Sequence, residues 1–103
     1  MIVIKIGTVP GDVKVMDIPN TLESLQEHVG GYIETCAPVD LKQRGIELIA
    51  NEEGLLKGLA PNPNLYPFFF VGTMLVVGVG DEDFTGLTDD QMLFVFEWLN
   101  RLV

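Results

Sequence analysis

The sequence has few of the residues on which disulfide bonding, metal binding and catalysis usually depend. Its 103 residues include one cysteine, one histidine and one serine. A single cysteine cannot form an internal disulfide, and a single histidine cannot supply a histidine-based metal cage. We therefore expect neither a disulfide-stapled secreted domain nor a zinc finger, and we expect no bound metal or cofactor.

Basic residues are also scarce. Six lysines and arginines stand against fifteen acids, which leaves a net charge of −9. Because contacts to phosphate need clustered Lys and Arg, this composition argues against direct nucleic-acid binding. The stretch between Lys57 and Arg101 has no base at all, and its acids are Asp81, Glu82, Asp83, Asp89, Asp90 and Glu97. Such an acidic face favours a cationic partner, or it serves only to keep an apolar chain in solution.

Long apolar runs and a basic leader are missing as well. Residues 60–80 carry no charge, but three prolines and Gly72 interrupt them. The longest unbroken apolar part is far below the roughly 18 residues that a membrane span needs. Residues 1–6 are apolar without the basic flank of a signal peptide. Together with the single cysteine, these features predict a cytoplasmic protein that does not enter membranes.

Apolar residues are plentiful, at 48% of the chain. This is too apolar for a disordered acidic tail. A chain of this length buries roughly 60–68% of the surface that it exposes when unfolded, which is enough for one core. We expect a single domain spanning residues 1–103.

The first third of the chain predicts a hairpin followed by a helix. Apolar residues alternate over residues 2–6 and 13–18, and Pro10-Gly11 between them suits a type II turn. Residues 20–29 have an apolar stripe at helical spacing, with Asn20 as the expected N-cap and Glu23 at the capping-box position. Gly30 and Gly31 then end the helix through a left-handed cap.

The rest of the chain predicts strands, an irregular loop and a second helix. We expect strands over residues 32–36, 46–51 and 73–79, and a proline-rich loop over 58–67. Thr88 and Gln91 form a capping box that opens the last helix. The predicted fold is α+β, in the order β-β-α-β-β-β-α, with two helices on a mostly antiparallel sheet of about five strands.

Two arrangements come close to known sites and fall short. Residues 81–92 match a calcium loop at several positions, but Met92 stands where the bidentate Glu belongs, and a strand-like segment precedes the loop where a helix is required. Ser24 and His28 are four residues apart on the predicted helix, yet no acid orients the histidine and no oxyanion hole is evident. We therefore expect that the protein is not an enzyme.

The last helix is apolar over an unusually wide arc. Met92, Val95, Phe96, Leu99 and Val103 form one face. Leu93, Phe94 and Trp98 widen the apolar arc to about 260°, whereas a surface helix commonly buries a little over 100°. The excess indicates a second contact surface, which is a subunit interface, a partner groove or the chain's own loop at 58–70. The partner-binding residues that this pattern predicts are Leu93, Phe94, Trp98 and Arg101.

Four segments carry a family resemblance: residues 20–34, 51–62, 71–73 and 83–90. Together they are similar to domain of unknown function family 3846, and the chain departs from that pattern in the apolar run 65–70. The resemblance implies a small protein of bacteriophages, plasmids and conjugative elements, and it brings no activity and no catalytic residues. Among the shared residues, Asn51 and Gly54 bound a turn in which Asn and Gly tolerate left-handed angles. Asn62 either pins the 58–67 loop by bonding backbone groups or bonds a ligand.

Three functions remain in competition. The leading hypothesis is a non-catalytic module that binds a protein partner or forms a homo-oligomer. The first alternative is an acidic DNA mimic that inhibits a host restriction or defence enzyme, with carboxylates in the place of phosphates. The second alternative is a protein that binds or sequesters a small ligand such as a nucleotide, with the 58–67 loop as its lid.

Overall fold

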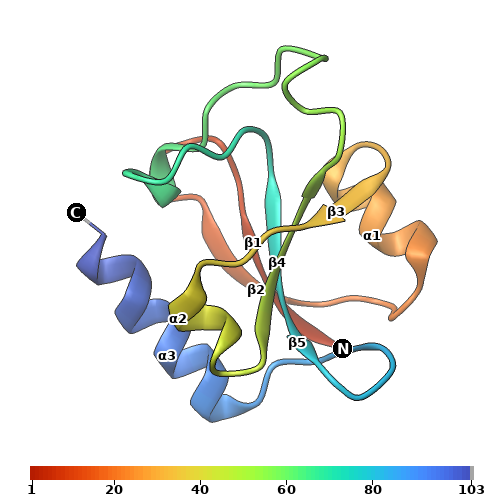
Figure 1. Ribbon diagram of the computed structural model, residues 1–103, viewed down its shortest axis with the longest axis vertical. Coiled ribbons are helices and arrows are strands. Elements are labelled where there is room, and N and C mark those ends of the chain that lie inside the picture. The colour runs from red at the N-terminus through yellow and green to blue at the C-terminus, as the bar shows by residue number, and fades with distance from the viewer. Residues whose placement is uncertain (103) are drawn as a thin grey trace.

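The computed structural model describes residues 1–102 and is built on one six-stranded antiparallel sheet (Figure 1). The strands run in the spatial order β2-β1-β5-β4-β3, and β6 pairs with β5 outside that path. The strands are β1 (Ile2–Ile6), β2 (Val13–Asp17), β3 (Ile33–Thr35), β4 (Ile46–Asn51), β5 (Met74–Val79) and β6 (Phe84–Thr85). The helices are α1 (Leu22–Val29), α2 (Val39–Lys42) and α3 (Asp89–Arg101), with a 3₁₀ turn at Pro63–Leu65. The predicted α+β class is confirmed.

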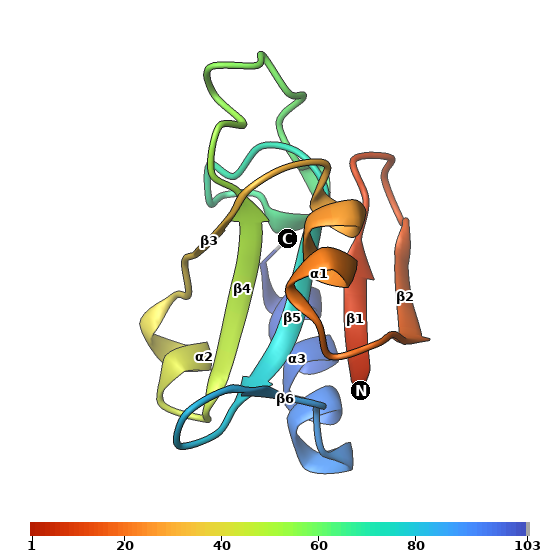
Figure 2. The same cartoon turned by 90° about the vertical axis from the view of Figure 1, so that its right-hand side faces the viewer.

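The sheet lies between two layers. Helix α1 covers one face, while α3 and α2 lie on the other (Figure 2). Strand β5 contributes to both cores because side chains alternate between the faces of a strand. Met74 and Val76 join the α3-side core, and Leu75 and Val77 join the α1-side core. The nearly all-apolar sequence of β5 thus follows from its central place in the sheet.

The predicted hairpin is confirmed. Strands β1 and β2 pair with Ile4 opposite Val15, and the amide of Asp12 donates to the carbonyl of Val9 over 3.0 Å. Gly11 has a φ of 84°, the value that a type II turn requires at its third position.

The start of α1 differs from the prediction, whereas its end agrees. The N-cap is Thr21, whose Oγ1 accepts a hydrogen bond from the Ser24 amide at 3.1 Å. Asn20 instead donates to the carbonyl of Phe84, so the capping pair Asn20 and Glu23 is wrong. Both Asn and Thr are favourable N-cap residues, but here the side chain of Asn20 is hydrogen-bonded to the backbone of β6. Gly30 takes a left-handed φ of 81° and ends the helix, as predicted.

The capping box of α3 is also confirmed, with Thr88 and Gln91 bonding each other's backbone amides. The Nε2 of Gln91 further donates to the carbonyls of Arg44 and Gly45 and so ties α3 to the turn before β4. The strand at 46–51 is confirmed, and the strands expected at 32–36 and 73–79 are present in shortened form. The short elements α2 and β6 were not predicted. No helix within residues 1–102 is long and apolar enough to cross a membrane.

Candidate functional site

The structure places Trp98 inside the protein, and its predicted place on a second, outward surface is wrong. Its side chain is only 3% exposed and belongs to the core on the α3 side of the sheet. The indole stacks on Phe68, with ring centroids 5.7 Å apart, and Phe68 stacks in turn on Phe70. Of the alternatives open for the wide apolar arc, the chain's own 58–70 loop is what covers this residue.

Of the other α3 residues predicted to bind a partner, Phe94 is partly covered and Leu93 is exposed. Phe94 is half-buried beneath two guanidinium groups, with Arg44 4.3 Å and Arg101 5.8 Å from its ring centroid. This geometry is a cation–π arrangement that shields the ring face. Leu93 remains 60% exposed and Phe96 is exposed beside it. Val103, which the pattern places on the same helix, lies outside the described residues.

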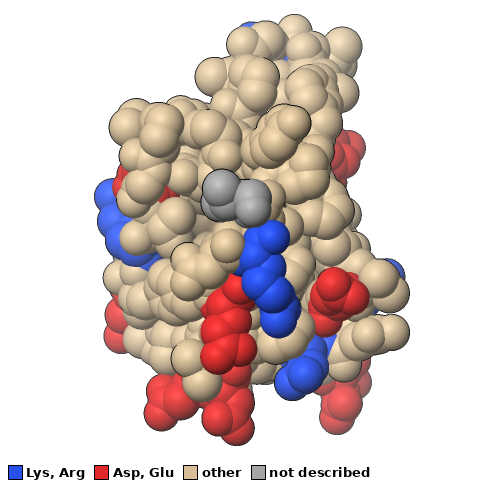
Figure 3. All heavy atoms as spheres, turned by 90° about the vertical axis from the view of Figure 1, so that its left-hand side faces the viewer, with Lys and Arg blue, Asp and Glu red and all other residues tan. Residues whose placement is uncertain are grey.

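The acidic residues gather at one end of the molecule. Asp81, Glu82 and Asp83 are exposed in the turn between β5 and β6, and Asp89 and Asp90 are exposed in the first turn of α3. Acidic side chains cluster at the lower end of the face in Figure 3, and the upper part of that face is almost free of charge. Within residues 1–102, no group of three or more His, Cys, Asp or Glu side chains is arranged to hold a metal ion.

His28 and Cys36 lie in different surroundings, and each has charged neighbours. The Nδ1 of His28 lies 3.0 Å from the Nζ of Lys5 on β1. Burial, and then the neighbouring ammonium of Lys5, lower the pKa of His28 below its ordinary value of 6.5. Burial, together with Glu34 and Glu47, raises the pKa of the Cys36 thiol to about 11, so this cysteine is a poor nucleophile at neutral pH.

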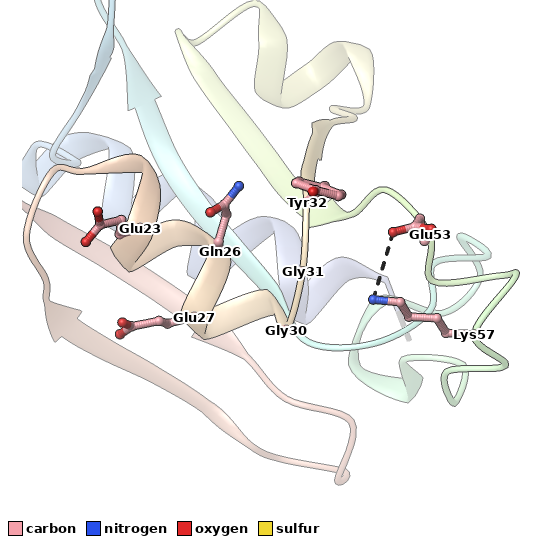
Figure 4. Close-up of a pocket in the computed structure, with 8 residues that line it drawn as sticks. All are labelled: Glu23, Gln26, Glu27, Gly30, Gly31, Tyr32, Glu53 and Lys57. Carbon is pink, nitrogen blue, oxygen red and sulfur yellow. Dashed lines mark ion pairs between the residues drawn. The ribbon is translucent and has the colours of Figure 1, made fainter.

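An open pocket of about 540 Å³ lies between α1 and the segment that follows β4. In Figure 4, Tyr32 stands between the two walls, and Glu53 and Lys57 point toward each other across an ion pair of 4.0 Å. A Cβ at Gly31 would lie 3.0 Å from the Asn51 amide and 3.1 Å from the Lys57 ammonium, so a larger residue there would require these neighbours to shift by a few tenths of an ångström. Glu23 and Glu27 on α1 give this pocket an acidic rim.

A more distinctive feature is the long connection between β4 and β5, residues 52–73, which we call the lobe. It rises beyond the end of the sheet at the top of Figure 1. The buried side chain of Asn62 donates to the carbonyl of Ile6 at 3.1 Å and to that of Gly72 at 3.0 Å. Of the two roles considered for Asn62, pinning the loop is the one that these bonds support.

Further polar contacts hold the lobe. Asn64 donates to the carbonyls of Gly7 and Val9 and accepts from the amide of Gly11, which fastens the lobe to the β1–β2 turn. At the other end, the buried Asn51 accepts from the amide of Glu53 and donates to the carbonyl of Val29. These bonds join the lobe to the β1–β2 hairpin and tie the residue just before it, Asn51, to α1.

The predicted turn at residues 51–54 is present, but the reason given for it is wrong. Neither Asn51 nor Gly54 has a positive φ. Asn51 is needed for its amide bonds, and Gly54 is needed for space, since a Cβ there would lie 2.8 Å from a methyl group of Val71.

Large apolar side chains of the lobe face solvent. Leu56 is 88% exposed, Phe69 71% and Leu55 70%, and Tyr66 is similarly open. Burying one such side chain would contribute about 1.5–3 kcal/mol, so a chain that leaves several in water gives up considerable stability. Apolar patches of this kind on an ordered surface mark interaction sites. The signal in the sequence was Leu55-Leu56 and the apolar run 65–70 in a proline-rich segment, where no regular strand or helix can bury them.

Beside the exposed leucines the lobe forms a groove of about 480 Å³. Its lobe-side wall contains Leu55, Leu56, Phe69, Phe70 and Val71. Its lining also includes Glu34 of β3, Cys36 just after that strand, and Glu52 at the start of the lobe. The groove therefore combines apolar side chains of the lobe with the carboxylates of Glu34 and Glu52.

Residues 1–100 match the model of a domain of unknown function, DUF3846. No curated protein and no solved structure matches the chain.

Proposed function

The chain belongs to the DUF3846 family of domains of unknown function, and from that premise we propose that it acts as a non-catalytic module that binds another protein through the lobe. The observation that carries this proposal is the contrast within the lobe. Its backbone is fixed by Asn62 and Asn64, yet Leu55, Leu56 and Phe69 are held in water. A rigid apolar surface loses little conformational entropy when a partner covers it.

The net charge supports a partner different from the chain itself. At −9, two copies repel each other over distances on the order of the Debye length, about 8–10 Å at moderate salt. A homo-oligomer needs enough buried apolar area to overcome that repulsion, whereas a basic partner gains from the same field.

The experiment compares two leucine-to-aspartate variants. Leu56→Asp places a charge on the lobe, and Leu93→Asp places the same charge at an exposed leucine on α3. The tagged parent and both variants are expressed in the native host cell, and the proteins that co-purify with each are quantified. We expect Leu56→Asp to lose the specific partner and Leu93→Asp to retain it. Loss with Leu93→Asp alone would return the interface to α3, and equal recovery with both variants would refute the proposal.

A second candidate function rests on the acidic end. The β5–β6 turn and the start of α3, which are separated along the chain only by β6 and a short loop, bring their carboxylates to one end of the molecule (Figure 3). This clustering favours an inhibitor that imitates the phosphates of DNA.

The charge-reversed triple variant Asp81→Lys, Asp83→Lys and Asp90→Lys tests that candidate. If the protein is a DNA mimic, the parent inhibits a restriction nuclease of its host in a salt-dependent manner, and the variant does not. Asp40→Lys, which reverses an exposed acid on α2, is the matched control. Inhibition that is insensitive to both charge and salt, or no inhibition by the parent, would exclude mimicry.

A further inference from the structure

Strand β3 ends the sheet with unpaired backbone groups. Within residues 1–102 no strand lies beyond it, and it forms the outer edge in Figure 2. The amide of Glu52 donates to the carbonyl of Tyr32, and the amide of Cys36 donates to the carbonyl of Leu48. Hydrogen bonding alternates along an antiparallel strand, so Ile33 and Thr35 turn their N–H and C=O groups away from β4. These groups can receive an added strand.

The groove described above adjoins this edge. Glu34 of β3 and Cys36, just after that strand, form part of its lining, together with the exposed Leu55, Leu56 and Phe69 of the lobe. A strand laid along β3 sends alternate side chains to the two faces of the sheet. Those on the groove side lie next to the apolar wall of the lobe.

The charges around the groove select the occupant. Glu34 and Glu52 line it, and Glu47 lies close enough to raise the pKa of Cys36 together with Glu34. A second copy of the chain is a poor occupant, because pairing two β3 strands about their centre would set Glu34 opposite Glu34, and like charges directly opposite are destabilising. Lysine or arginine at that place would be favourable instead.

We propose that β3 is the docking edge for an extended segment of a partner protein, and that this segment adds a strand to the sheet. Every second side chain of the segment faces the groove, and these groove-facing positions combine a basic residue opposite Glu34 with apolar residues against the lobe. The proposal rests on the protein-binding function above and names the mode and the chemistry of the partner. Main-chain bonds to Ile33 and Thr35 supply affinity, and the groove and its carboxylates supply specificity, as in other cases of strand addition.

The probe is a short synthetic peptide in which every second residue, on the side that faces the groove, is in turn phenylalanine, lysine and valine, with threonine at the positions between them. Nuclear magnetic resonance follows the backbone amides of the protein as the peptide is added. We expect the amide hydrogens of Ile33 and Thr35 to exchange at least about tenfold more slowly when the peptide is bound, because they become part of a ladder. A peptide with glutamate in place of lysine, and one with proline at the pairing positions, are expected not to bind.

Matched variants separate the contributions. Glu34→Lys should weaken the lysine peptide about fivefold to tenfold, since it replaces an opposite-charge cross-strand pair by a like-charge one. Glu97→Lys, which reverses an exposed acid on α3, should leave the affinity within about twofold. Leu56→Asp should weaken binding through the loss of the apolar wall.

The possible outcomes separate a failure of strand addition at β3 from a failure of the proposed protein-binding function. If the peptide does not bind, or binds without protecting Ile33 and Thr35, strand addition is wrong, and the lobe is still tested by the native partner's response to Leu56→Asp. If that partner is lost with Leu56→Asp but retained with Glu34→Lys, the lobe binds and β3 does not. Protection of Ile33 and Thr35 on raising the protein concentration alone would make a second copy the occupant and overturn the proposal.

Discussion

At the scale of single residues, the polar side chains for which the sequence allowed a binding or catalytic role make contacts within the fold. Asn62 and Asn51 are buried, and their side-chain amides donate hydrogen bonds to backbone carbonyls. His28, the only histidine, takes Lys5 as its neighbour, not Ser24. The spacing of residues in the sequence shows which side chains share a face of a helix. Which of them form contacts depends on the strand that packs against that face.

The partial burial of His28, with Lys5 beside it, predicts how stability depends on pH. Because the pKa of His28 is lowered in the folded protein, the unfolded chain binds the proton more readily. The stabilisation from neutral His28 is therefore fully present above about pH 6.5 and is lost as the pH falls below that value. Urea unfolding at pH 7.5 and pH 5 should show a larger loss of unfolding free energy for the parent than for His28→Gln, whose side-chain oxygen can still accept from Lys5. Equal losses would contradict the lowered pKa.

At the scale of elements, the sequence predicts what local chemistry determines. The β1–β2 turn, the strand Ile46–Asn51 and the Thr88 capping box follow from alternation, a Pro-Gly pair and a reciprocal cap. The outer face of α3 could not be predicted in the same way. A helical wheel counts apolar positions, but Phe68 and Arg44, which cover Trp98 and Phe94, come from distant parts of the chain.

The same limitation explains why the lobe was not the predicted interface. Its exposed leucines are unremarkable in sequence, and their significance depends on the bonds from Asn62 and Asn64 that hold the segment against β1 and the β1–β2 turn. The short elements α2 and β6, of four and two residues, carry too few positions to show a period.

The buried position of Trp98 gives a prediction for α3. Trp98→Ala should lower the free energy of unfolding by about 3–5 kcal/mol, because it removes a large side chain from the core together with its stacking contact to Phe68. Phe96→Ala, two positions away and exposed, should cost less than about 1 kcal/mol. Denaturant titration measures both, and the fluorescence of this single tryptophan in the parent should resist quenching by acrylamide. Similar costs for the two variants would place Trp98 at the surface.

At the scale of the whole molecule, the charges are far from balanced by local pairing. In the described part of the chain, the side-chain ion pairs are Lys14 with Asp12 at 3.6 Å and Lys57 with Glu53 at 4.0 Å, and all four side chains are well exposed. Exposed pairs contribute little. Most of the fifteen acids therefore act on the fold through mutual repulsion, and most strongly at the end that holds the β5–β6 turn and the start of α3.

This repulsion predicts that added salt stabilises the fold. Between low salt and about 0.5 M sodium chloride the unfolding midpoint should rise, because screening shortens the range over which the carboxylates interact. The double variant Asp81→Asn and Glu82→Gln should be more stable than the parent at low salt by a few tenths of a kcal/mol to about 1 kcal/mol, and the difference should shrink at high salt. Asp12→Asn, which removes an acid that has Lys14 beside it, should bring no such gain. A parent whose midpoint ignores salt, or a double variant that is less stable than the parent, would mean that the acidic turn is held by contacts that outweigh its charge.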